Sequence, residues 1–326
     1  MRLLVIAALV LGPRVADACL WDYDTLKEET LGQEDVGAVI GGDLHKHSRT
    51  FYEAKVTYTR TIIDGGKAPQ ERYDDLAVAL AKLGKLDDAL AVLADKDTKF
   101  PGEYTTEANR GTFLAAKGDI AGALEHLRKA IAINPDAHFG REKFQIQFLD
   151  YLGKLAKDPK LAMRESFLAI DTGGDGGFTE SRVITGLDRE PGKPRRVKVP
   201  TPEVTAIVGI IRFGDGQDNP HLWYALGWAF VMQGDAQLAA RAFRRADVLG
   251  HPRGHADGAN TASTIKKLDG ICCSKDLNDA RTAEPWKKLV KLADDEWAHG
   301  QAADARRQHD EDVKIARGQL KAVFGY

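Results

Sequence analysis

The sequence YDDLAVALAKLGKLDDALAVLADKDTKFP at residues 73–101 recurs in altered form as EANRGTFLAAKGDIAGALEHLRKAIAINP at residues 107–135. An offset of 34 residues places Gly84 on Gly118, and both stretches end in proline. A repeat of this length, with small residues in register, is typical of stacked pairs of antiparallel helices. The sequence therefore predicts an all-α protein built from helix–turn–helix repeats.

Each copy has the pattern of two short helices that pack against each other. Tyr73, Leu76 and Leu80 follow the spacing of one buried helix face. Gly84 then ends this helix, because glycine adopts the left-handed C-terminal conformation without steric cost. A second apolar face follows, and Pro101 stops the helix that carries it.

A third copy lies further along the chain. It has the pattern W-x2-L-G-x2-F followed by A-x3-F-x2-A, formed by Trp223, Leu226, Gly227, Phe230, Ala239, Phe243 and Ala246. Together with the two earlier copies, this pattern resembles the tetratricopeptide repeat family over three units. The resemblance implies a right-handed α-solenoid in which the first helix of each repeat lines a concave groove.

The resemblance also implies which residues face that groove, where this family receives an extended peptide or a helix. By register they are Asp74, Val78, Asn109, Thr112, Tyr224, Trp228 and Met232. Asn109 matches one position of the family's best-known carboxylate-binding groove, whereas Asp74 and Val78 depart from it, so that activity is not carried over. Tyr224, Trp228 and Met232 either form an adaptable interface or pack against an apolar helix predicted at Val204–Phe213.

The N-terminus has the features of a secretory signal. Arg2 precedes an apolar run from Leu3 to Leu11, and Ala16-Asp17-Ala18 fits the small-x-small cleavage rule. The apolar run is too short to span a bilayer. The sequence therefore predicts export to the periplasm or cell envelope, with residues 1–18 removed.

Cys19 would be the first residue of the mature protein. That placement resembles a bacterial lipoprotein, in which this cysteine is acylated and tethers the protein to a membrane. Ala16 and Asp17 depart from the lipoprotein pattern, so a plain cut that leaves Cys19 free or disulfide-bonded stays an equal alternative. The stretch Leu20–Asp24 resembles the mature starts of exported bacterial repeat proteins.

The chain divides into six segments. They are a signal peptide (1–18), an N-terminal segment and helix pair (19–64), tetratricopeptide-like repeats (65–171), a Gly/Pro-rich basic loop (172–202), a helix and repeat (203–252), and a loop followed by C-terminal capping helices (253–326). Within them, a degenerate repeat is expected at 138–171, with its second helix beginning at Asp158-Pro159. The stretch from His251 to Asn260 is expected to be loop because it contains Gly254 and Gly258. The loop at 172–202 is either a basic arm for an acidic partner or anionic lipid, or a solvated linker.

Charge and cysteine content limit the classes of function. The 46 basic and 48 acidic residues nearly balance, so no nucleic-acid partner is expected. Three cysteines are too few for a disulfide framework. The vicinal pair Cys272-Cys273 lacks the CxxC spacing of redox motifs, which favours a structural or incidental role, and in an oxidising compartment one of the two could pair with Cys19.

The sequence contains no recognisable catalytic motif, phosphate-binding loop or zinc-protease helix. His45 and His47 would point to different faces of a helix predicted within 34–64. The stretch from Asp171 to Glu180 lacks ligands at key positions of a calcium loop. The sequence therefore predicts no enzymatic activity, no cofactor and no metal.

The leading hypothesis is a non-enzymatic scaffold, exported to the cell envelope, that binds a protein or peptide in its concave groove. The alternative is a structural or accessory component of an envelope assembly, tethered to the membrane through Cys19. Acylation of Cys19 distinguishes the second hypothesis from the first.

Overall fold

The chain was analysed as a computed structural model, which describes residues 20–30, 36–136, 140–168, 201–214, 216–269 and 283–326. These residues contain fourteen α-helices and no strand, which confirms the predicted all-α class. The predicted signal peptide, Cys19, the calcium-like stretch, most of the basic loop and the Cys272-Cys273 pair lie outside the described residues.

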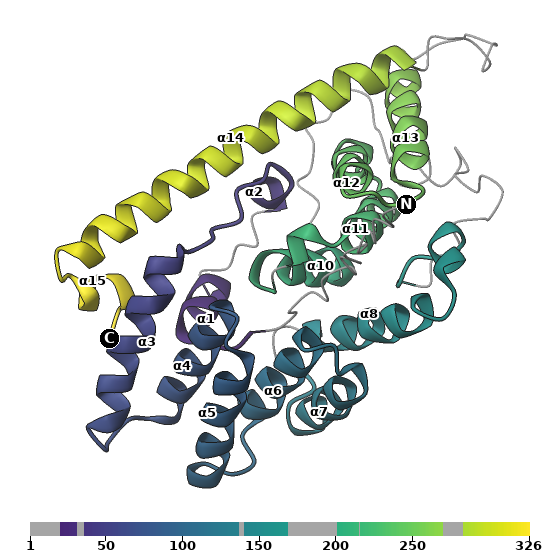
Figure 1. The fold of residues 1–326 in the computed structure, drawn as a ribbon. Coiled ribbons are helices and arrows are strands. Elements are labelled where there is room, and N and C mark those ends of the chain that lie inside the picture. The colour runs from purple at the N-terminus through teal and green to yellow at the C-terminus, as the bar shows by residue number, and fades with distance from the viewer. Residues whose placement is uncertain (1–19, 31–35, 137–139, 169–200, 215, 270–282) are drawn as a thin grey trace, which may run out of the picture.

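The first half of the chain is a row of helices in which each packs against the next along the sequence (Figure 1). Two short helices, α1 and α2, precede the row, and α3 begins it. The bounds are α1 Tyr23–Thr30, α2 Val36–Ile40, α3 Arg49–Asp64, α4 Gln70–Lys82, α5 Leu86–Lys99, α6 Tyr104–Ala116, α7 Ile120–Ile133 and α8 Arg141–Leu155.

The second half continues the row through α10, which contacts both α8 and α11. Apolar residues of α8, α10, α11 and α12 form the largest hydrophobic cluster of the described residues. The elements are η2 Pro159–Met163, α10 Pro202–Phe213, η3 Gly216–Asp218, α11 Pro220–Gln233, α12 Ala236–Val248, α13 Gly254–Asp269, α14 Ala283–Ala316 and α15 Leu320–Phe324.

The sequence copies correspond to helix pairs with matching geometry. The glycines that end α4, α6 and α11, at positions 84, 118 and 234, all have a left-handed φ, of 78°, 85° and 76°. A Cβ added to Gly111 would lie 2.7 Å from Cγ of Leu127, and one added to Gly227 would lie 2.5 Å from Cε1 of Phe243. Glycine at positions 111 and 227 therefore allows the two helices of a pair to approach closely.

The C-terminal helices join the two ends of the row. Helix α14 packs on α12 and α13 at one end and on α3 at the other, where α15 also docks (Figure 1). Its 34 residues span about 50 Å. Gly300 lies against the Gly41-Gly42 turn, since an added Cβ would lie 2.2 Å from the Gly41 carbonyl oxygen. The sequence predicted a terminal cap, and it did not predict this return to α3.

Three further expectations were wrong. The stretch from His251 to Asn260 was expected to be loop because of its glycines, but α13 begins at Gly254. Those glycines provide close packing instead: an added Cβ at Gly254 would lie 2.5 Å from the Asp247 nitrogen, and one at Gly258 would lie 2.3 Å from Cη2 of Trp286.

The predicted second helix after Asp158 is reduced to the 3-10 turn η2. Asp158 accepts a hydrogen bond from the Lys160 nitrogen, which caps this single turn, and irregular backbone follows through residue 168. The predicted helix pair within 34–64 is also shorter than expected, because residues 43–48 between α2 and α3 are irregular. His45 and His47 therefore do not lie on a helix.

Candidate functional site

The seven predicted groove residues lie on α4, α6 and α11, and six of them are buried. Asp74, Val78, Asn109, Thr112, Tyr224 and Trp228 have exposed fractions between 0% and 2%, whereas Met232 is 59% exposed. Six of the seven are therefore covered by other parts of the chain in this structure, and only Met232 faces solvent.

On α11, the cover is made by neighbouring helices. Tyr224 and Trp228 belong to the same apolar cluster as Val204 and Ile211 of α10. The Tyr224 hydroxyl donates a 2.7 Å hydrogen bond to Oδ2 of Asp257 on α13. The structure thus agrees with the alternative stated above, in which these aromatic residues pack against the apolar helix.

On α4 and α6, residues 20–23 of the chain cover Asn109, whereas Thr112 accepts a 3.2 Å hydrogen bond from Nε2 of Gln145 on α8. Oδ1 of Asn109 accepts the Trp21 backbone N–H at 2.8 Å, and Nδ2 of Asn109 donates to the Trp21 carbonyl oxygen at 3.0 Å. Oδ1 of Asp75 accepts the Tyr23 N–H at 2.8 Å. The inner face of these helices therefore holds a peptide backbone through side-chain hydrogen bonds.

Side chains of the same segment fill apolar sites on this face. Leu20 is 1% exposed and belongs to a cluster with Leu76 and Phe113. The ring of Trp21 lies edge-on to Tyr104, with ring centroids 5.6 Å apart. Leu20 and Trp21 thus contact this face through apolar and aromatic side chains, whereas the Asn109 contacts involve only the backbone of Trp21.

Asp74 fixes the orientation of the Asn109 side-chain amide. Its Oδ1 accepts a 3.2 Å hydrogen bond from Nδ2 of Asn109, which directs the amide oxygen toward Trp21. Lys96, fully buried, donates to the other carboxylate oxygen of Asp74 at 2.6 Å. Burial raises the pKa of Asp74 to about 6, although Lys96 acts in the opposite direction.

Lys55 of α3 binds the next part of the segment. It is fully buried, and its Nζ lies 2.8 Å from Asp22, 2.5 Å from Asp24 and 3.6 Å from Asp75. Burial opposes the charge of Lys55, but these three carboxylates raise its pKa well above the usual value. Burial likewise opposes the charge of Asp22, but Lys55 lowers the pKa of this carboxyl to about 2.

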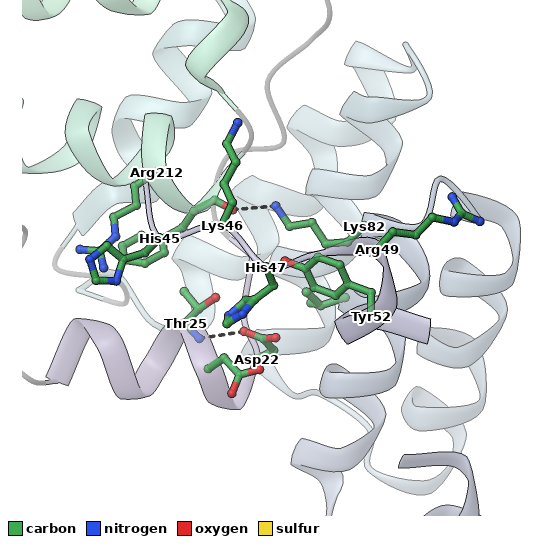
Figure 2. Close-up of a pocket in the computed structure, with 12 residues that line it drawn as sticks. Asp22, Thr25, His45, Lys46, His47, Arg49, Tyr52, Lys82 and Arg212 are labelled. Carbon is green, nitrogen blue, oxygen red and sulfur yellow. Dashed lines mark hydrogen bonds between the residues drawn. The ribbon is translucent and has the colours of Figure 1, made fainter. Parts of the chain in front are cut away.

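A cavity of about 260 Å³ adjoins residues 20–24, which we call the seated segment (Figure 2). Asp22 and Val78 form part of its wall, so it continues the face that holds Trp21. Its other lining residues come from α1, the 43–48 connection, α3, α4 and α10. The cationic and imidazole side chains in the wall are His45, Lys46, His47, Arg49, Lys82 and Arg212.

The connection that carries His45 and His47 is held in place by α14. Asp304 accepts hydrogen bonds from the backbone nitrogens of Leu44 at 2.9 Å and Lys46 at 3.2 Å. His45 between them has a φ of 52°, a left-handed conformation that costs about 1–3 kcal/mol for a residue other than glycine. Nδ1 of His47 lies 2.9 Å from Glu311, which raises the His47 pKa although burial opposes this.

Several of these features were not predicted from the sequence. The only signal for the seated segment is the apolar and aromatic start Leu20–Tyr23 after the predicted cleavage site. Lys55 could have been suspected, because it shares a buried helical stripe with Phe51 and Thr59. No sequence pattern singles out Lys82 and Arg212 as site residues, because only tertiary packing brings them to one cavity.

No protein-family model matches the chain, and no curated protein shows significant similarity to it. Within the described ranges, no group of three or more His, Cys, Asp or Glu side chains is placed to hold a metal ion. None of the described helices has the apolar length that a bilayer crossing requires.

Proposed function

We propose that this protein is a non-enzymatic, right-handed α-solenoid of tetratricopeptide-like repeats that binds a protein or peptide and is exported to the cell envelope. The solenoid is supported by the succession of helix pairs, each packed on the next. It is also supported by the equivalent close contacts of Gly111 with Leu127 and of Gly227 with Phe243.

The observation that carries the binding function is the double hydrogen bond of Asn109 to the backbone of Trp21. Backbone N–H and C=O groups are common to all peptides, and a side-chain amide that pairs with both recognises an extended strand of any sequence. The sites of Leu20 and Trp21 then add preference for an apolar residue followed by an aromatic one. A partner segment of this kind would bind in place of the chain's own residues 20–23.

The test uses a chain that can be cut between α1 and α3. A protease site replaces residues 31–35, and the cut protein is titrated with a labelled peptide of residues 20–30. We expect saturable exchange of this peptide for the chain's own segment. Asn109→Ala should weaken binding by about 1–3 kcal/mol, roughly 5- to 150-fold, because Trp21 loses two hydrogen-bond partners.

Asn134→Ala is the matched control, because Asn134 is an exposed residue at the end of α7. It should bind the peptide as the unmodified protein does. If the cut protein keeps its helicity and yet takes up no peptide, or if Asn109→Ala binds it equally well, then this face is not a peptide site.

The second candidate function is that of a structural or accessory component of an envelope assembly, tethered through Cys19. It is favoured by the position of Cys19, which directly precedes the seated residue Leu20. Mass spectrometry of the mature N-terminus checks this proposal. Two or three fatty acyl chains on Cys19 would support it, and an unmodified cysteine would remove it.

A further inference from the structure

The cavity beside the seated segment is lined mainly by positive charge. Four lysine and arginine residues form part of its wall, against two aspartates. Lys46, Lys82 and Arg212 come from the 43–48 connection, α4 and α10, three separate parts of the fold. Figure 2 shows Arg212 beside His45 at the left of the view, and Arg49 at the right.

The negative charges of the two aspartates in the wall are paired with a lysine that is not part of the lining. Asp22 and Asp24 both bind Nζ of Lys55, which is fully buried and is not part of the lining. Of the cations, Arg49 pairs with Glu53, His47 with Glu311, and Nε2 of His45 lies 3.8 Å from Oδ1 of Asp43; none of these acids is part of the lining. The lining thus carries more lysine and arginine than aspartate, and low-dielectric walls strengthen the field of such an excess.

The wall is also held in a fixed shape. Nζ of Lys82 donates to the Phe213 carbonyl oxygen at 3.2 Å, which ties the end of α4 to the end of α10. His45 is held in its left-handed conformation between two backbone nitrogens that bind Asp304. Residues kept in such rare conformations cluster at binding sites, where the surrounding structure determines them.

We propose that this cavity binds a small organic anion that carries carboxylate or phosphate groups, with Lys46, Lys82 and Arg212 contacting the charged groups. Carboxylate and phosphate oxygens form the charge-assisted hydrogen bonds that lysine and arginine favour. The volume of 260 Å³ equals the share of about nine water molecules in the liquid, at about 30 Å³ each. It admits a dicarboxylic acid or a phosphate ester and excludes a folded macromolecule. Val78 and Phe213 supply an apolar wall for the body of the ligand.

The test is isothermal titration of the full chain with two probes, succinate and inorganic phosphate, each at the same ionic strength set with sodium chloride. We expect one or both probes to bind with a stoichiometry of one. The double variant Lys82→Gln/Arg212→Gln should lose at least tenfold in affinity. The control Arg128→Gln/Lys129→Gln removes the same charge from exposed positions on α7 and should stay within twofold of the unmodified protein.

Binding of succinate alone would identify a carboxylate ligand, and binding of phosphate alone a phosphorylated one. If the double variant loses helicity by circular dichroism, Lys46→Gln replaces it, because Lys46 is half-buried and lies outside the helices. A folded protein that binds neither probe, or a folded cavity variant that binds as tightly as the control, would overturn the proposal.

Discussion

Two buried histidines should make this protein sensitive to mild acid. His221 at the start of α11 and His251 before α13 have exposed fractions of 9% and 4%, and their rings lie with centroids 5.1 Å apart. Nδ1 of His221 and Nε2 of His251 have no hydrogen-bond partner among the described residues. A neutral ring carries one proton, and the second proton that charges either ring would lie in a buried site; on His251 it would also displace the 3.3 Å hydrogen bond that Nδ1 accepts from the Arg253 N–H.

The loss of unfolding free energy at acidic pH follows from the pKa values of the two histidines. Burial lowers the pKa of His221 from 6.5 to about 4. Burial, together with the charges of His221 and Arg253, lowers the pKa of His251 from 6.5 to about 2. Between these values and pH 6.5 the unfolded chain binds protons that the folded chain does not, so the free energy of unfolding falls as the pH falls. At pH 5 each histidine removes about 2 kcal/mol, or about 4 kcal/mol for the pair.

The assay is urea unfolding at pH 7.5 and pH 5, followed by circular dichroism, for the unmodified protein and for His221→Phe/His251→Asn. Asparagine keeps an acceptor for the Arg253 N–H, which His251 Nδ1 accepts at 3.3 Å. The variant should lose about 4 kcal/mol less than the unmodified protein between the two pH values. Equal losses in the two proteins would refute the reasoning.

The other titratable groups around His221 and His251 do not contribute to the expected difference between the two proteins. Burial raises the pKa of the Asp257 carboxyl, which stabilises the folded protein as the pH falls, but this contribution is present in both proteins. The tyrosines that contact the pair, Tyr151 and Tyr224, have pKa values raised by burial and titrate only in strong base. The difference between the two proteins therefore isolates the histidines.

Four further substitutions test the packing, each by urea unfolding at pH 7.5. Lys55→Met removes the cation that three carboxylates share and should cost about 3–5 kcal/mol; a loss below about 1 kcal/mol would contradict the buried network. Gly227→Ala places a methyl group 2.5 Å from Phe243 and should cost about 1–3 kcal/mol, whereas Gly153→Ala, with no atom within 4 Å, should stabilise by about 0.4–1 kcal/mol. Phe324→Ala removes a ring with 0% exposure at the α15–α3 contact and should cost about 3–5 kcal/mol, unless α15 does not dock.

The helix pairs that the sequence predicted are those whose signals are local. Gly84, Gly118 and Gly234 each end a helix, and a glycine does this by its own backbone freedom, without reference to distant residues. The glycines of α13 were misinterpreted for the same reason. Gly254 and Gly258 look like loop residues in sequence, and only the positions of Asp247 and Trp286 show that they allow close helix packing.

The sequence could single out Asn109, but it could not show what Asn109 contacts. Asn109 was singled out as a groove residue, and the structure places its amide on a peptide backbone. That this backbone belongs to Trp21, 88 positions earlier in the chain, could not be inferred, because no sequence pattern records which segment fills a groove. Whether Tyr224 faced a partner or α10 was open for the same reason.

The cavity depends most on contacts that sequence reasoning cannot reach. Its His45–His47 wall has no regular hydrogen bonding of its own, and Asp304 and Glu311 of α14 supply the partners for that wall. These pairs are 258 to 264 positions apart, and the close contact of Gly300 with the Gly41-Gly42 turn brings them together. The return of α14 thus has two consequences with one cause: it closes the helix row onto α3, and it sets the shape of the cationic cavity.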